Sequence, residues 1–365
     1  MAAETLLFVL AALLAVPLAW ALPRALAFDG VAAVGLIVLA GISPVSAAWL
    51  VLSVMITTAA AHLAERMRHR GIVLACATTL IAGVLLASRV VHGWGMITMA
   101  YATLRNLHVL AEVWMRHLRA PRLRAMLRYQ LFVPVMIVGP INLMPSFERE
   151  LALRRFHRED LAVGAERALI GLAMATVLIS KGVLAIGFWA VALSYHLPPF
   201  AAEWLLSAVD WVRIYCVFAG LSSFAIGVAR MMGIRIAENF DRPFVSRSLM
   251  EFWTRWHISL SNWCRDYVFR PLTAATRQPV LGLAAAMVAI GLWHDTSFYY
   301  IAWGLWQAAG IALNRMLIGQ ARRLRMTVPS RMAAVLGPLA VFAWLSLARP
   351  VVHLLARHGL AFLLH

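Results

Sequence analysis

Charged residues, and lysine above all, are scarce in this sequence. Only 13% of its 365 residues are charged, and Lys181 is its single lysine. A soluble domain has about a quarter charged and about half apolar residues, whereas here 62% are hydrophobic and the mean hydropathy is +0.79. These values exclude an ordinary soluble protein. Because uncharged runs recur along the chain, they predict an all-α membrane protein that crosses the bilayer many times.

Cysteine is scarce as well. The three cysteines, Cys76, Cys216 and Cys264, lie in or beside apolar stretches and show no CxxC spacing. An odd number without that spacing argues against a disulfide framework. We interpret them as small hydrophobic side chains in a reduced or lipid-shielded setting.

Acidic residues are outnumbered by basic ones, 16 to 33, which gives a formal net charge of +17. In a soluble protein this excess would suggest nucleic acid as a partner. Here the arginines gather in short loops between apolar runs, for example from Arg66 to Arg70 and from Arg116 to Arg128. The positive-inside rule explains such loops as cytoplasmic anchors. We therefore expect the lipid bilayer, and no nucleic acid, as the partner of this charge.

Apolar runs predict one membrane domain, 1–365, of about ten or eleven helices at roughly 20 residues per span. No basic residue precedes the first run, so we expect a retained first span rather than a cleaved signal peptide. Gly139, Pro140 and Pro145 predict a partial or re-entrant element over 132–145, and the charged patch 148–167 predicts an amphipathic surface helix. The expected spans are 5–22, 30–41, 45–63, 71–91, 94–114, 168–197, 203–229, 278–293, 297–314, 332–348 and a short tail, 351–364.

The stretch 240–272 differs from its surroundings, because arginines and tryptophans alternate there with little purely apolar sequence. Read as one helix, it places Glu251 four residues before Arg255 and Asp266 four before Arg270, so that each pair can meet. His257 shares a face with a serine four residues later. Such a helix has no wholly apolar side for lipid. We expect its polar groups to face a cavity inside the protein.

A second polar feature, Gly291 to Ser297, reads GLWHDTS between two apolar runs that each have an arginine at the far end. His294 lies 17 residues after Arg277, roughly 25 Å along a helix and short of a ~30 Å hydrocarbon core. This pattern predicts a helical hairpin with both ends on the basic side and a buried turn. A histidine in such a turn is suited to accept a proton near neutral pH.

Other interpretations of these residues stay open at this point. A histidine at a helix break is often a structural hydrogen-bonding group, and His257 with His294 would also suit a haem or a metal. However, neither has a histidine or cysteine three or four residues away, so we expect no metal site. The tryptophans are as compatible with interface anchoring as with a ligand channel.

Two long motifs resemble a known family. They are YCVFAGLSSFAIGVARMMGIRIAENFDRPFVSRSLMEFWTRWHISLSNWCRDYVFRPL, 215–272, and GLWHDTSFYYIAWGLW, 291–306. This motif core, 215–306, resembles the membrane-bound O-acyltransferase family, and within it the bacterial alginate O-acetylation and teichoic-acid D-alanylation subgroup. The resemblance implies a ring of membrane helices around a thinned centre with a through-membrane cavity. It also implies a multi-pass protein of the bacterial cytoplasmic (inner) membrane.

The same resemblance implies roles for individual residues. His294 matches the catalytic histidine of the family, and His257 matches a second histidine of its pattern. We hypothesise that His294 is the general base and that His257 helps to orient a thioester donor, either acyl-CoA or an acyl carrier protein, with no bound cofactor. The expected channel residues are Trp253, Trp256, Asn262, Trp293, Arg255 and Arg265.

Three positions depart from the family pattern. The usual Trp-His-Gly reads Trp293-His294-Asp295 here, Gln307 replaces a histidine that is common in the following helix, and Val217 stands where an acid is frequent. Asp295 would either make the histidine more basic or cap the next helix, and we favour the cap. These departures concern donor and acceptor identity more than the chemistry.

Three functions follow from these observations. The first is an O-acyltransferase that moves an acyl group, with acetyl the commonest, to a hydroxyl of an extracytoplasmic polysaccharide or other envelope acceptor. The second is a relay of D-alanyl or another acyl group from a carrier protein, with a secreted transferase as a further partner. The third is a proton-coupled transporter that uses the two histidines as a relay.

Overall fold

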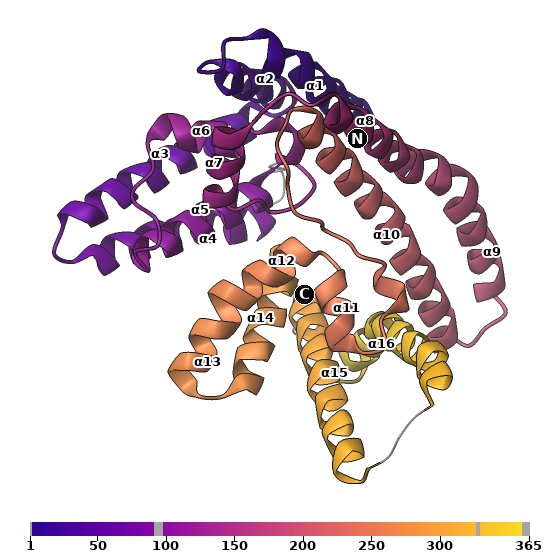
Figure 1. The fold of residues 1–365 in the computed structure, drawn as a ribbon. Helices are drawn as coiled ribbons and strands as arrows, with labels where there is room; N and C mark the ends of the chain where they lie inside the picture. Colours follow the sequence, from indigo (N-terminus) through magenta and orange to yellow (C-terminus); the bar gives the residue numbers. More distant parts are fainter. Residues whose placement is uncertain (1, 91–97, 326–328, 360–365) are drawn as a thin grey trace. The chain divides into compact units, whose positions relative to one another are not determined.

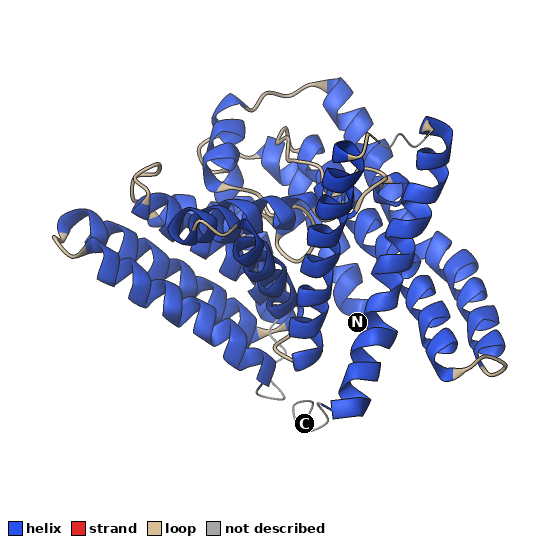
Figure 2. Ribbon diagram, turned by 90° about the horizontal axis from the view of Figure 1, so that it is seen from below, coloured by secondary structure: helices blue, strands red, loops and turns tan. Residues whose placement is uncertain are grey.

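The computed structural model describes residues 2–90, 98–325 and 329–359, and these are almost entirely helical. No strand occurs among them, apart from one isolated bridge between Phe240 and Trp256 (Figure 2). The protein is therefore an all-α membrane protein. In the described chain, six helices are long and apolar enough to cross a bilayer: Glu4–Ala21, Pro44–Arg66, Arg70–Arg89, Arg158–Ser194, Pro199–Met231 and Ser330–Leu355. Ala27–Ile42 and Pro279–His294 are shorter apolar helices. The count of ten or eleven spans and the ring stay predictions.

The described residues group into two compact units, 1–172 with 221–237 and 173–220 with 238–365. This grouping leaves the single membrane domain a prediction. The first unit holds α1 (Ala2–Ala21), α2 (Ala27–Ile42), α3 (Pro44–Arg66), α4 (Arg70–Val90), α5 (Met99–Trp114), α6 (Leu123–Gln130), η1 (Val133–Val135), α7 (Met144–Leu153) and α8 (Arg158–Ala173) (Figure 1). The second holds η2 (Met174–Val183), α9 (Leu184–Ser194), the first two thirds of α10 (Pro199–Met231), η3 (Pro243–Val245), α11 (Leu249–Arg255), α12 (Ile258–Cys264), η4 (Arg265–Phe269), α13 (Arg270–Thr276), α14 (Pro279–His294), α15 (Phe298–Arg323) and α16 (Ser330–Gly359).

A partial or re-entrant element was expected over 132–145. The segment is a loop that only the three-residue η1 interrupts before α7 begins, and its re-entry into the membrane stays a prediction. Its backbone carbonyls are bound by buried side chains of the first unit. Arg105, which is 1% exposed, donates to the carbonyl of Val135 at 2.6 Å. Tyr129, also buried, donates to the carbonyl of Asn142. Non-helical backbone inside a membrane protein needs such internal partners.

Two expectations about helices were wrong. The patch 148–167 is not one surface helix, because α7 ends at Leu153 and α8 begins at Arg158. The run 332–348 is not separate from the described part of 351–364, because α16 continues through Pro350 to Gly359; 360–364 lie outside the described residues. Proline inside a membrane helix is tolerated where neighbouring groups satisfy the freed carbonyl, so its presence did not mark an end.

The predicted hairpin is confirmed as α14 and α15, which lie side by side in the second unit. Two glycines bring the helices close. A Cβ atom on Gly304 would lie 2.6 Å from the carbonyl oxygen of Met287, and one on Gly291 would lie 2.2 Å from that of Tyr300. Real Cβ atoms do not approach oxygen so closely. The absence of side chains at these two positions therefore fixes how α15 returns along α14 from the turn at His294.

This packing predicts opposite effects for two alanine substitutions on α15. Gly319→Ala meets no atom within 4 Å, so helix propensity should stabilise the protein by up to about 1 kcal/mol. Gly304→Ala forces the two helices apart and should cost about 1–3 kcal/mol. Thermal unfolding of the detergent-solubilised protein measures both changes. Equal melting temperatures for the two variants would contradict close packing at Gly304.

Candidate active site

His257 occupies a break between two short helices of the second unit. Ser248 caps the start of α11, because its hydroxyl accepts from the backbone N–H of Glu251 at 3.1 Å as N-cap serines do. The helix ends at Arg255. Trp256 is extended, and His257 has a φ of +42°, in the left-handed region. The break turns the chain before α12 begins at Ile258.

A neighbouring segment holds this break open. The backbone N–H of Asp241 donates to the carbonyl of Arg255 at 3.0 Å, and the N–H of Ile258 donates to the carbonyl of Asn239 at 2.9 Å. The Asn239 side chain, fully buried, accepts from the hydroxyl of Ser259 at 2.9 Å. The single helix that was expected over 240–272 is therefore wrong, because tertiary hydrogen bonds satisfy backbone groups that a continuous helix would have used. The Glu251–Arg255 and Asp266–Arg270 ion pairs are confirmed, at 2.9 and 2.8 Å.

His294 is the last residue of α14. Asp295 follows in an extended conformation, and its carboxylate accepts from the backbone N–H of Thr296 at 2.7 Å. This contact shapes the turn into α15, but it does not cap that helix, because α15 begins only at Phe298. The capping role of Asp295 stays a prediction. The turn is less buried than expected, because His294 and Ser297 are exposed. His294 is accessible because it faces a cavity rather than the packed core.

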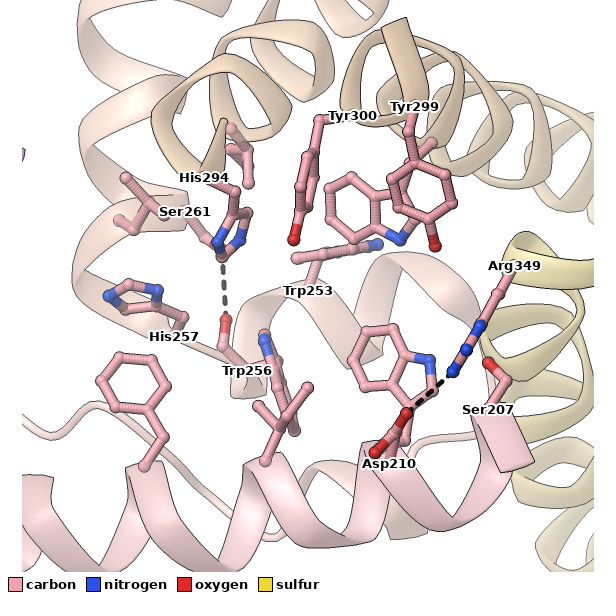
Figure 3. A pocket seen from close by; sticks show the side chains of 16 residues that line it. Ser207, Asp210, Trp253, Trp256, His257, Ser261, His294, Tyr299, Tyr300 and Arg349 are labelled. Carbon is pink, nitrogen blue, oxygen red and sulfur yellow. Dashed lines mark hydrogen bonds and ion pairs between the residues drawn. The ribbon is translucent and has the colours of Figure 1, made fainter. Parts of the chain in front are cut away.

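A cavity of about 320 Å³ contains both histidines (Figure 3). Its volume lies at the lower end of the roughly 300–1,000 Å³ range of small-molecule sites. His294, His257 and Ser261 lie at one end, and Asp210, Arg349 and Ser207 lie at the other, with Trp253 and Tyr300 between them. The lining residues are Ser207, Asp210, Trp211, Ile214, Phe218, Trp253, Trp256, His257, Leu260, Ser261, Ile290, His294, Tyr299, Tyr300, Trp303 and Arg349.

Aromatic rings fix both imidazoles. Trp293 packs against both, with ring centroids 5.4 Å from His257 and 4.8 Å from His294. Tyr300 stacks on His294 at 5.5 Å with an interplanar angle of 22°. Phe218 meets His257 edge to face at 4.6 Å. These contacts hold the rings in place and leave the accessible edge of His294 for a reactant.

His257 is 3% exposed, and its Nε2 atom has no hydrogen-bond partner among the described residues. It lies in the connection between α11 and α12, outside the candidate membrane-spanning helices. Burial, and the nearby His294, hold the pKa of His257 well below its ordinary value because both disfavour the charged ring. His257 is therefore neutral near pH 7, and its Nε2 atom is buried.

A second cavity of about 240 Å³ lies next to the first, and the two share Trp253, Ser261 and Ile290 as lining residues. It follows the hairpin away from the turn, toward Arg315 near the end of α15. Two of the expected channel residues, Asn262 and Arg265, line it. By the positive-inside rule we expect this end on the cytoplasmic side, because α14 follows Arg277 and α16 begins beside Arg331. The first cavity instead adjoins the turn of the hairpin, where His294, Tyr299 and Tyr300 line it.

Cys264 also lines the second cavity. Burial raises the pKa of its thiol to about 12. A thiol with that pKa stays protonated near neutral pH, and the thiolate is the nucleophilic form. Cys264 is therefore unsuited to exchange with a thioester. No group of three histidine, cysteine, aspartate or glutamate residues suited to a metal occurs in the described chain.

The expected residues are distributed as follows. Trp253, Trp256, His257 and His294 line the first cavity. Trp293 supports the histidines from behind, and neither cavity is lined by Trp293, Arg255 or Gln307. The sequence reasoning missed the lining residues Ser207, Asp210, Tyr299, Tyr300, Trp303, Arg315 and Arg349. For Asp210 and Arg349 a signal existed, because each is a charge inside an apolar run and such charges usually pair.

Comparison with known proteins agrees with this geometry. The model of the membrane-bound O-acyltransferase family matches residues 116–348, more than half of the chain and including both histidines. The chain belongs to this family. The matched region of this O-acyltransferase family member includes α10 to α15 and the first part of α16.

Individual relatives differ in their named acceptors. The chain is 35% identical over 187 residues to a probable alginate O-acetylase, AlgI, of Pseudomonas aeruginosa, covering 50% of this chain and 35% of that protein. It is 31% identical over 267 residues to a teichoic acid D-alanyltransferase of Streptococcus thermophilus, covering 67% and 62%. It is 27% identical over 235 residues to a peptidoglycan O-acetyltransferase of Helicobacter pylori, covering 61% and 43%. The matches thus span between about a third and two thirds of these relatives' lengths.

Proposed function

We propose that this protein is an O-acyltransferase that moves an acyl group, in the first instance acetyl, from a cytoplasmic thioester to a hydroxyl of an extracytoplasmic polysaccharide or other cell-envelope acceptor. Its place is the bacterial cytoplasmic (inner) membrane. The observation that carries the proposal is the position of His294. It lines the first cavity, and that cavity shares the lining residues Trp253, Ser261 and Ile290 with the second one. Relatives named as O-acetylases and O-acetyltransferases support the reaction class.

The reaction needs one base and no bound cofactor. The hydroxyl oxygen of the acceptor attacks the thioester carbonyl carbon while His294 takes the hydroxyl proton. The tetrahedral intermediate then collapses, the carbon–sulfur bond breaks, and the imidazolium of His294 returns the proton to the leaving thiolate. One ester and one thiol result, and His294 is neutral again.

His257 would stabilise the carbonyl group of the thioester while the acceptor attacks it. Its buried Nε2 has no partner among the described residues, so a hydrogen bond to a ligand would satisfy it. A neutral imidazole with its N–H directed at the carbonyl oxygen would stabilise the oxyanion, a contribution typically worth 10²–10³-fold in rate. Trp253 and Trp256, both buried in the cavity wall, would exclude water from the acyl group.

The direct test supplies purified protein in lipid vesicles with labelled acetyl-CoA and a hydroxyl acceptor. Release of free thiol together with ester on the acceptor supports the proposal. Proton movement without thioester consumption would instead support a transporter. No turnover of acetyl-CoA by a correctly folded protein would contradict the donor assignment.

A second candidate is transfer of D-alanyl from a carrier protein, which the 31% identity to a teichoic acid D-alanyltransferase over 67% of this chain favours. The same vesicles distinguish the two. Activity with acetyl-CoA alone supports the first candidate. Activity only after addition of a D-alanyl carrier protein supports the second.

The second cavity, which we call the donor cavity, offers a matched pair of variants. Arg265 and Arg270 both form ion pairs with Asp266, at 2.9 and 2.8 Å, but only Arg265 lines the cavity. If Arg265 contacts a phosphate of the donor arm, Arg265→Ala should raise the donor KM about tenfold, as loss of a charge-assisted contact of about 1.4 kcal/mol does. Arg270→Ala should leave that KM within about twofold, since exposed ion pairs contribute little. Equal shifts in the two variants would refute a donor contact by Arg265.

A further inference from the structure

In the first cavity, the end opposite His294 is formed by two helices that are far apart in sequence. Ser207 and Asp210 come from α10, and Arg349 comes from α16. Arg349 Nη1 donates to Asp210 Oδ2 at 3.0 Å, and Figure 3 shows this pair facing the cavity beside Tyr299. The reaction described above assigns no role to these groups.

The pair is open to a ligand. The side chains of Asp210 and Arg349 are 40% and 38% exposed. Arg213 donates to the other carboxylate oxygen of Asp210 at 3.1 Å without lining the cavity, so the carboxylate is fixed from behind. Arginine has five N–H donors, more than one carboxylate oxygen can accept from. The pair therefore offers a hydrogen-bond acceptor, the carboxylate of Asp210, next to a hydrogen-bond donor, the guanidinium of Arg349.

In the topology that the proposed function requires, the pair lies on the side from which an extracytoplasmic acceptor arrives. Arg349 is 19 residues beyond Ser330, where α16 begins near the basic loop. At 1.5 Å per residue this is about 28 Å, close to the full ~30 Å of the hydrocarbon core. The thioester reaches His294 from the opposite direction. A group bound by Asp210 and Arg349 is therefore part of the acceptor.

We propose that Asp210 and Arg349 bind neighbouring hydroxyl groups of a sugar ring in the acceptor and so present a further hydroxyl of that sugar to His294. This inference rests on the proposed function and gives its acceptor a chemical class. A carboxylate accepts from one hydroxyl while the guanidinium donates to the next, which matches a vicinal diol. The apolar C–H face of a sugar ring suits the aromatic lining of Trp211, Tyr299 and Trp303.

The charges favour a neutral sugar edge over an anionic group. A carboxylate or phosphodiester bound to Arg349 would lie beside the carboxylate of Asp210, and like charges at that distance repel. A simple lipid alcohol has one hydroxyl group and an apolar chain, so it would cover the remaining polar atoms of the pair without hydrogen-bonding all of them. Hydroxyl groups avoid both costs.

The test measures acceptor binding and turnover separately. Three probes are used: a neutral β-linked glucose tetrasaccharide, an oligouronate and a glycerol-phosphate oligomer. Binding is followed by quenching of tryptophan fluorescence, because Trp211 and Trp256 line the cavity, and turnover by ester formation from acetyl-CoA. The variants are Asp210→Asn and Arg349→Gln. Glu203→Gln is the matched control, because Glu203 pairs with His353 on the same two helices at 3.1 Å and lines neither cavity.

We expect saturable binding of the tetrasaccharide, a rise of tenfold or more in its dissociation constant and acceptor KM in both variants, and donor KM and melting temperature close to wild type. Glu203→Gln should change none of these values. The inference is overturned if neither variant shifts the acceptor constants, or if both KM values and the melting temperature change together, as for a purely structural pair. It is also overturned if only the two anionic probes bind, or if none binds. The proposed function fails independently if the wild type binds sugar yet forms no ester.

Discussion

Replacing His294 with asparagine should lower kcat for ester formation by about 10²–10⁴-fold, the usual contribution of a positioned general base. This corresponds to about 3–5 kcal/mol of lost transition-state stabilisation. Asparagine keeps a polar side chain at the end of α14 but cannot take the proton of the attacking hydroxyl. The donor KM should change little, because the donor cavity is not lined by His294. Initial rates of ester formation at saturating acetyl-CoA and acceptor give kcat directly.

His117→Asn is the control for this variant, since His117 is 65% exposed and pairs with Glu112 in the first unit. It should retain the wild-type rate. Size-exclusion chromatography and thermal unfolding establish that both variants are folded. A folded His294→Asn protein with wild-type kcat would refute the role of this histidine as base.

Filling the junction of the two cavities should abolish transfer to a similar extent. Ser261 lines both cavities and donates to the carbonyl of Trp256 at 3.2 Å. Ser261→Phe places an aromatic ring where the acyl group must pass from the donor cavity to His294. Ester formation should fall below about 1% of wild type, because displacing a reactant by about 1 Å already costs on the order of 10²-fold.

Further substitutions of Ser261 distinguish the effect of side-chain size from the effect of the lost hydrogen bond. Ser261→Ala removes the hydroxyl at a cost of about 1 kcal/mol in stability and should leave activity within about threefold. Ser261→Val should be intermediate. Loss of activity already in Ser261→Ala would mean that the hydroxyl, rather than free space, is what the reaction needs.

The all-α fold class, and the choice of His257 and His294 as candidate site residues, could be predicted from local sequence features. Apolar runs and the arginine loops predict the spans and their direction, because length and charge alone decide insertion. The GLWHDTS turn predicted the α14–α15 hairpin, and the structure places His294 at its tip. These features depend only on residues near one another in the chain.

The conformation of His257 could not be predicted from the residues next to it in the sequence. A continuous helix satisfies the local pattern, and His257 adopts a left-handed φ because Asn239 and Asp241 bond the backbone across the break. Histidine tolerates this region better than most residues, but tolerance does not predict its use. Asp210 and Arg349 are 139 residues apart, and only the packing of α10 against α16 brings them into one cavity.

The central claim is that donor and acceptor reach His294 from opposite faces of the membrane. Sealed vesicles of uniform orientation test it, with labelled acetyl-CoA enclosed on the side of Arg265 and Arg315 and a membrane-impermeant oligosaccharide only on the other. The account predicts His294-dependent ester on the oligosaccharide while free CoA stays on the donor side. Ester that forms only when both reactants share one face would contradict it.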